Sequence, residues 1–139
     1  ALYYDRLYPA VEMAQITEKL YENRLFLEEC LNTDELEIQK QLIDGISRNN
    51  KKIDSLIVKY AESHLVDDEN KNLLVYRTEI SKYRHLEKEI IMLAKTDIEG
   101  AKMLFSKESS EEFRNMIEPI HKMTNIQLKI GQDLRDDSL

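Results

Sequence analysis

The hydrophobic residues of this chain recur at alternating three- and four-residue steps along most of its length, which is the spacing of amphipathic α-helices. The first run predicts a helix from about Leu2 to Leu31. Its inward face has one polar member and consists of Met13, Ile16, Leu20, Asn23, Leu27 and Cys30. Pro9 lies in an early turn, where a proline bends a helix or marks its first turn.

A second helix is predicted to begin near Asn32, because Asn32 and Glu35 have the spacing of a capping box. Its expected inward face is Leu36, Ile43, Ile46, Asn50, Ile53, Ile57 and Tyr60. Gly45 lies inside this helix and weakens it by about 1 kcal/mol relative to alanine. Counting outward from the hairpin places Asn50 at the level of Thr17, where a polar layer would fix the register of the two helices.

Acidic residues mark the predicted start of a third helix. Asp67 and Asp68 are expected to supply its N-cap, since carboxylates there face the positive end of the helix dipole. The helix is expected to end near Lys95. Its inward residues are predicted to be Leu73, Tyr76, Ile80, Tyr83, Ile90 and Ala94. The mixed charges of residues 87–89 are expected on a solvated face.

Two more capping boxes lie close together and predict a short helix over about 97–106, then a long one over about 110–136. The boxes are Thr96 with Glu99 and Ser109 with Glu112. One continuous helix with a local irregularity is the alternative. Pro119 should kink the last helix, because a proline cannot donate a hydrogen bond to the carbonyl of Asn115. The inward face is predicted to be Phe113, Met116 or Ile117, Ile120, Met123 or Thr124, Gln127, Ile130 and Leu134.

These segments predict an all-α fold, an up-down-up-down antiparallel four-helix bundle with a short extra helix or irregularity before the last helix. The 139 residues suffice for one core, so we expect a single domain over 1–139. An even number of antiparallel helices returns both chain ends to one side, which suits a domain placed between two membrane spans. Because the chain opens with Ala1, we expect it to be a piece excised from a longer membrane protein.

Charge and composition exclude several classes of protein. The net charge of −7 disfavours DNA, RNA and anionic lipid surfaces as partners, since these need basic patches. The longest apolar run, 90–94, is too short for a membrane span or a signal peptide. Cys30 is the only cysteine and sits at an inward helical position, so a buried structural thiol is predicted.

One motif has metal-ligand spacing. Glu118 and His121 form Glu-x-x-His, which in di-iron bundles places two ligands inward on one helix. Such sites need a second copy, and neither His64 nor His85 has a glutamate three residues earlier. We therefore expect His121 at the edge of the inward face or on the surface. No strand end or strained turn is available for a nucleophilic triad, so no enzyme activity, metal or cofactor is expected.

The first helix is aromatic on more than one face, which indicates more than one packing partner. Tyr3, Tyr8 and Tyr21 are the predicted contacts with a second protomer. The alternative is one wide core face flanked by long amphipathic side chains.

The opening of the chain, with the pattern Tyr3-x-x-Arg6-Leu7-x-Pro9, resembles the start of the four-helix-bundle sensory domain of bacterial methyl-accepting chemotaxis proteins. The order of segments is similar too. Residues 32–34 and 66–69 look like that family's first two hairpins, and 95–101 looks like its acidic turn followed by alanine.

This resemblance implies a periplasmic or extracellular ligand-binding domain of a bacterial membrane protein, anchored on both sides. It implies a homodimer formed through the first and last helices, and a small molecule bound near the membrane-distal end. Arg24 matches the first ligand-holding arginine of the family, whereas the later arginine positions hold other residues. Phe105, Lys107 and Ser109 fall where the last helix would contribute. The alternative role for Arg24 is a surface salt bridge with Glu28.

The leading hypothesis is thus a chemoreceptor sensor that binds a small molecule and signals by displacement of the last helix, with Pro119 and the break at 107–109 as candidate switch points. The same module is similar to sensor regions of histidine kinases and diguanylate cyclases. A further alternative is a bundle that dimerises or binds a partner protein, such as a periplasmic binding protein, without a small-molecule ligand. The residues alone also leave open a metal- or haem-binding bundle and a cytosolic adaptor.

Overall fold

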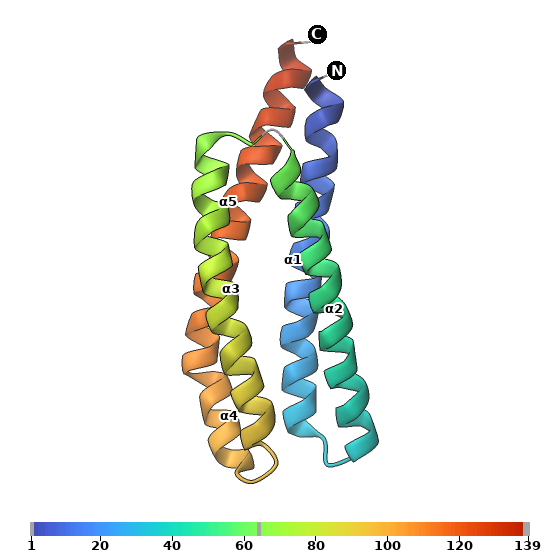
Figure 1. Cartoon of the computed structure of the whole chain (residues 1–139), viewed down its shortest axis with the longest axis vertical. Coiled ribbons are helices and arrows are strands. Elements are labelled where there is room, and N and C mark those ends of the chain that lie inside the picture. The colour runs from blue at the N-terminus through green and yellow to red at the C-terminus, as the bar shows by residue number, and fades with distance from the viewer. Residues whose placement is uncertain (1, 64, 138–139) are drawn as a thin grey trace.

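The computed structural model of the protein describes residues 2–63 and 65–137, with side chains described from residue 9 onward in these ranges. The helices are α1 (Leu2–Asn32), α2 (Leu36–Glu62), α3 (Asp67–Leu93), α4 (Ile98–Ser106) and α5 (Glu108–Asp137). The described residues contain no strand. The α1–α2 hairpin packs against α3 and α4–α5, and both chain ends lie at one end of the bundle (Figure 1). The predicted all-α four-helix bundle with a short helix before its last segment is confirmed.

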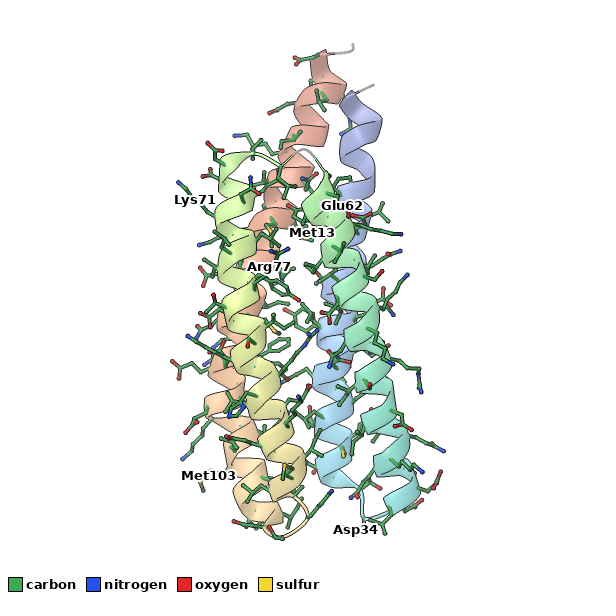
Figure 2. The ribbon with its side chains drawn as sticks, viewed as in Figure 1. Met13, Asp34, Glu62, Lys71, Arg77 and Met103 are labelled. Atoms are coloured by element: carbon green, nitrogen blue, oxygen red, sulfur yellow. The ribbon has the colours of Figure 1, made fainter. Side chains whose placement is uncertain are left out.

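The apolar core is divided into two clusters. The larger cluster lies toward the chain ends and includes Met13, Leu20 and Phe113, and Figure 2 shows Met13 between the helices. The smaller lies toward the hairpins and includes Leu27, Ile46, Ile90 and Ala101. Every predicted inward residue of α1 from Met13 to Cys30 is buried, so that face and the buried thiol are confirmed.

A polar layer separates the two clusters. We define it as Asn23 and Arg24 of α1, Asn49 and Asn50 of α2, Glu87 of α3 and Ser109 of α5. Asn23, Asn49, Glu87 and Ser109 are buried. Each of the long helices therefore contributes a polar side chain at the same height in the bundle.

The predicted register of the first hairpin is wrong. Asn50 accepts a hydrogen bond from Asn23, at 3.0 Å, and Thr17 instead donates to the carbonyl of Met13. Side chains on a helix lean toward its N-terminus, so those of α1 lean away from the hairpin and those of α2 lean toward it. Residues that touch are consequently at unequal distances from the turn, which a simple count ignores.

Several predicted caps are displaced by one or a few residues. Asn32 ends α1 and donates to the carbonyl of Glu28, so it does not cap α2, whose N-cap Glu35 has no side-chain cap bond. Leu36, predicted inward, is 79% exposed beside this turn. Val66 is the N-cap of α3, and its amide donates to Glu69.

The other end of α3 and the final segment show smaller shifts. Asp97, not Thr96, caps α4 by accepting from the amide of Gly100. One residue, Lys107, separates α4 from α5, with φ −106° and ψ −89°. α5 then continues through the buried Pro119 to Asp137. Two helices rather than one continuous helix therefore form the fourth segment.

Inward positions were predicted well where they are apolar. Ile130 and Leu134 of α5 and Ala94 after α3 are only half-buried, because they lie near the ends of the packed region. The burial of Glu69 was not predicted, and the prediction of a solvated face for Glu87 is wrong, because Glu87 is buried at the inward position between Tyr83 and Ile90. Tyr60 and Gln127 both donate hydrogen bonds to Glu69, so this carboxylate has partners inside the bundle.

Gly45 has a packing role in addition to its cost in helix propensity. A Cβ atom at this position would lie 2.9 Å from the ring of Phe26. Such contact is too close for a real side chain, so glycine lets α2 approach the Phe26 ring of α1.

Within the described residues, none of the helices combines the length and the apolar character of a membrane span.

Candidate functional site

Arg24 of α1 lies at the point where α3, α4 and α5 meet. Its Nη1 group donates to the hydroxyl of Tyr83, at 3.2 Å, and to Oγ of Ser109. Its Nη2 group donates to the carbonyl of Phe105, at 2.8 Å. One side chain thus joins the first helix to α3, α4 and α5, the three helices of the other half of the bundle.

Aromatic rings enclose the guanidinium group. Its Cζ atom lies 3.8 Å from the centre of the Phe105 ring, and the rings of Tyr83 and Phe113 are within 5.9 Å and 5.6 Å. A cation over an aromatic face is attracted to it, and the attraction is stronger when water is excluded. We call Arg24 with Tyr83, Phe105 and Ser109 the Arg24 junction.

The local sequence explains why the junction forms at this place. Phe105 lies in the last turn of α4, where the helix stops at Lys107. Carbonyl groups at a helix end lack some of their intrahelical donors, so they accept from side chains. Ser109 follows in the first turn of α5 and is fully buried. The break therefore presents a carbonyl, a hydroxyl and a ring to a single arginine.

A chain of hydrogen bonds connects α1, α2 and α3 beside this junction. Asn49 donates to Glu22, at 2.7 Å, and to Asn23, at 2.9 Å. Asn23 donates to Asn50, and the side chain of Asn50 is hydrogen-bonded to Glu87. Buried amides are costly unless they find such partners. The polar layer therefore favours one relative height of the three helices.

Glu87 is the buried acid of the layer. Burial raises the pKa of its carboxyl group to about 7, although Arg84, the hydrogen bond from Asn50, and Arg24 act in the opposite direction. Its Oε2 atom has no hydrogen-bond partner within the described residues. Burial also raises the pKa of Tyr83, to about 12, with the charge of Glu87 adding to the effect. Near neutral pH the layer therefore contains a carboxyl group close to its titration point.

Three of the four predicted ligand-binding residues come together. Arg24, Phe105 and Ser109 are in direct contact. Lys107 is exposed at the break and lines an open groove together with Leu93 and Met103. The alternative salt bridge of Arg24 with Glu28 is wrong, because the guanidinium group points to α4 and α5. Ligand binding by these residues stays a prediction.

Tyr83 and Glu87 also belong to the site, although neither was predicted to do so. Tyr83 was assigned only to the core. Glu87 completes the seam between Tyr83 and Ile90 at the four- and three-residue steps of the helix, and this regular spacing was the available signal.

The predicted interface tyrosines are only partly described. The side chains of Tyr3 and Tyr8 lie outside the described residues. Tyr21 is 43% exposed, stacks on His121 and contacts Phe113 edge-on. Its place at a dimer interface stays a prediction.

The Glu-x-x-His pair lies on the surface of α5. Glu118 is exposed and forms an ion pair with Lys122 at 3.0 Å. The exposed ring of His121 stacks on the ring of Tyr21. In the described part of the chain, no three His, Cys, Asp or Glu side chains are grouped as metal ligands would be.

Comparison with protein families adds one finding. A family model described as a four-helix-bundle sensory module for signal transduction matches residues 1–139. No match was found among curated proteins or among solved structures. The match covers the whole chain, including the polar layer and the Arg24 junction.

The buried carboxyl group predicts a specific pH dependence of stability. A raised native pKa means that the folded state holds the proton of Glu87 at pH values where the unfolded state has lost it. The free energy of unfolding should therefore fall as pH rises from about 4.5 to about 7, by about 3 kcal/mol from this group. Urea unfolding of Glu87→Gln, which stays neutral, should show a shallower fall across this range.

Glu112→Gln is a parallel test at a second carboxyl group and should also make the fall shallower. The pKa of Glu112 is also raised to about 7, by burial and by its contact with Glu79, and the groups that act on it are not those that act on Glu87. The double variant should be flatter than either single one. An unchanged slope in Glu87→Gln would show that Glu87 is ionised in the folded protein throughout this range.

Proposed function

Because the chain belongs to the family of four-helix-bundle sensory modules for signal transduction, we propose that it is the extracytoplasmic sensor of a membrane-anchored bacterial chemoreceptor. In this proposal a small molecule binds in the half distant from the chain ends, and displacement of α5 carries the signal. The shared position of the two chain ends supports it, since both could then continue into the membrane (Figure 1). A sensor region of a histidine kinase or diguanylate cyclase would use the same module.

The Arg24 junction is the observation that carries the proposal. It fastens α1 to the start of α5, and α5 runs from there to the end where the chain termini lie. A movement at the junction is therefore applied to the helix that leaves the domain.

An acidic small molecule is the ligand that best fits the donors of Arg24. A carboxylate accepts two parallel hydrogen bonds from one guanidinium group, more strongly than a hydroxyl or a carbonyl does. A ligand that took these donors would release Ser109 and the Phe105 carbonyl. The junction would then exist in two arrangements, one with Arg24 bonded to Ser109 and Phe105 and one with these groups released. A ligand shifts the populations only if it binds one arrangement more tightly than the other, and this shift would carry the signal.

A second face of α1 supports a homodimer. Alternating three- and four-residue steps of exposed positions run along this helix, parallel to its buried face. The exposed face consists of Val11, Ala14, Glu18, Tyr21, Leu25, Glu28 and Asn32. Leu25 is 57% exposed at its middle. This spacing is that of a coiled-coil seam, so a second copy of α1 fits it.

The absence of enzyme activity, like the identity of the partners, stays a prediction.

A thermal-shift screen of the folded domain tests ligand binding at the junction. The panel is amino acids, organic acids, aromatic acids, amines and purines, and a concentration-dependent rise in Tm is expected with an acidic class. Arg24→Gln should lose the rise, whereas Arg48→Gln, an exposed arginine of α2, should keep it. A flat screen on well-folded protein would contradict small-molecule binding and favour a bundle that binds a partner protein.

Sedimentation equilibrium tests the dimer. Leu25→Glu should weaken self-association at least about tenfold. It removes an apolar contact from the centre of the seam and places one carboxylate from each copy there, and these like charges repel one another. Leu74→Glu is the control, since Leu74 of α3 is 66% exposed and lies off this face. Equal effects of the two variants, or a wild-type domain that stays monomeric at high concentration, would contradict the α1 interface.

A further inference from the structure

The third helix has a basic face that the Arg24 junction does not use. Arg77, Ser81, Arg84 and Lys88 follow one another at steps of four, three and four residues, so they lie on one side of α3. Arg84 forms a two-pronged ion pair with Asp54 of α2, at 2.9 Å and 3.2 Å. This pair shows that the basic face is turned toward α2, and Figure 2 shows the position of Arg77 on α3.

The same residues line an open groove of about 480 Å³. Its lining is Arg77, Ile80, Ser81, Arg84, His85 and Lys88, without a carboxylate. The chain as a whole has a net charge of −7, so this concentration of positive charge runs against its overall balance. A groove lined by one sign of charge concentrates ions of the opposite sign.

Much of this positive charge is not neutralised by the protein. Neither Arg77 nor Lys88 forms an ion pair within the described residues, in contrast to Arg84, which pairs with Asp54. Nε2 of His85 lies 3.0 Å from a carboxylate oxygen of Glu89. Groups of like charge that share a groove repel one another, and a bound anion would relieve that repulsion.

Two buried donors stand behind the groove. The Nε atom of Arg84 and the hydroxyl of Tyr76 are buried and have no hydrogen-bond partner in the described part of the chain. Tyr76 is 2% exposed, and burial raises its pKa, with the charges of Arg84 and Asp54 also acting on its hydroxyl. The hydroxyl therefore lies near the ion pair that borders the groove. Buried donors of this kind favour an acceptor at the site.

We propose that this groove of α3 binds a small molecule carrying two or more acidic groups. Arg77 and Arg84 are two helical turns apart, which is about 10 Å along the axis, so one carboxylate or phosphate cannot neutralise both. Arg84 and Lys88 are one turn apart and can share a single group, with Ser81 donating from the same face. The spacing thus selects a di- or polyacid over a monoacid.

The groove is separate from the Arg24 junction. Its lining residues all belong to α3, and none of them is a hydrogen-bond or ring partner of Arg24. An acid bound there would replace part of the interaction between Arg84 and Asp54. It would therefore act on the contact between α2 and α3, and a sensor with two sites would respond to two compounds.

Isothermal titration calorimetry at low ionic strength tests the groove, with citrate and inorganic pyrophosphate as the two probes. Saturable binding of at least one is expected, and the stronger of the two shows whether carboxylate or phosphate groups are preferred. Arg77→Gln with Lys88→Gln should weaken binding at least about tenfold, the loss expected when charge-assisted contacts are removed. Acetate should bind far more weakly than either probe.

The matched control is Arg48→Gln with Lys52→Gln, which removes the same charge from exposed positions of α2. It should change affinity by less than about twofold, since it affects only the long-range field. An equal loss in both double variants, or no binding of either probe at millimolar concentration, would overturn the proposal. Arg24→Gln should leave binding intact, and this result separates a failure of the groove from a failure of the junction as a ligand site.

Discussion

The need of buried polar groups for partners is the constraint on which this bundle depends. Within the two apolar clusters the helices could shift along one another at a lower cost, because hydrophobic contact has no direction. The layer between them cannot, since Asn23, Asn49 and Asn50 satisfy one another only at one height of α1 against α2. Each misplacement by one turn would leave several buried amides without partners, at about 1–3 kcal/mol for each group. The layer therefore sets the register from which the positions of α3 and α5 follow.

The same layer explains why the last segment is divided. In a continuous helix the Phe105 carbonyl would accept a hydrogen bond from the backbone amide of Ser109. The break at Lys107 instead turns both groups toward Arg24, which is half-buried among three aromatic rings. The junction is polar, central and attached to the helix that runs to the chain ends. A site with these properties is well placed to convert a local exchange of hydrogen bonds into a displacement of α5.

Sequence reasoning predicted the parts of the fold that depend on apolar periodicity. The face from Met13 to Cys30 follows from apolar spacing. Two capping boxes predicted helices over about 97–106 and 110–136, close to the observed 98–106 and 108–137, but left one continuous helix as an alternative. The caps were less accurate, because Asn32 and Asp67 have the right chemistry but the N-caps of α2 and α3 are Glu35 and Val66, three residues and one residue away. Glu69 and Glu87 were missed because a search for apolar residues passes over an acid that occupies an inward position. The family resemblance named Arg24, Phe105 and Ser109, which the structure brings into contact. Lys107 lies exposed at the break, and only the structure shows on which side of the break each of these side chains lies.

The central claim is that Arg24 fastens α1 to the start of α5, and amide hydrogen exchange tests it most directly. In Arg24→Gln, exchange should rise at least about tenfold for amides from Phe105 to Glu111, while amides from Phe113 to Gln127 keep their protection. Local opening without global unfolding has this signature. Unchanged exchange around the break would show that the junction holds nothing in place. An equal rise along all of α5 would show that Arg24 supports the whole bundle rather than this one connection.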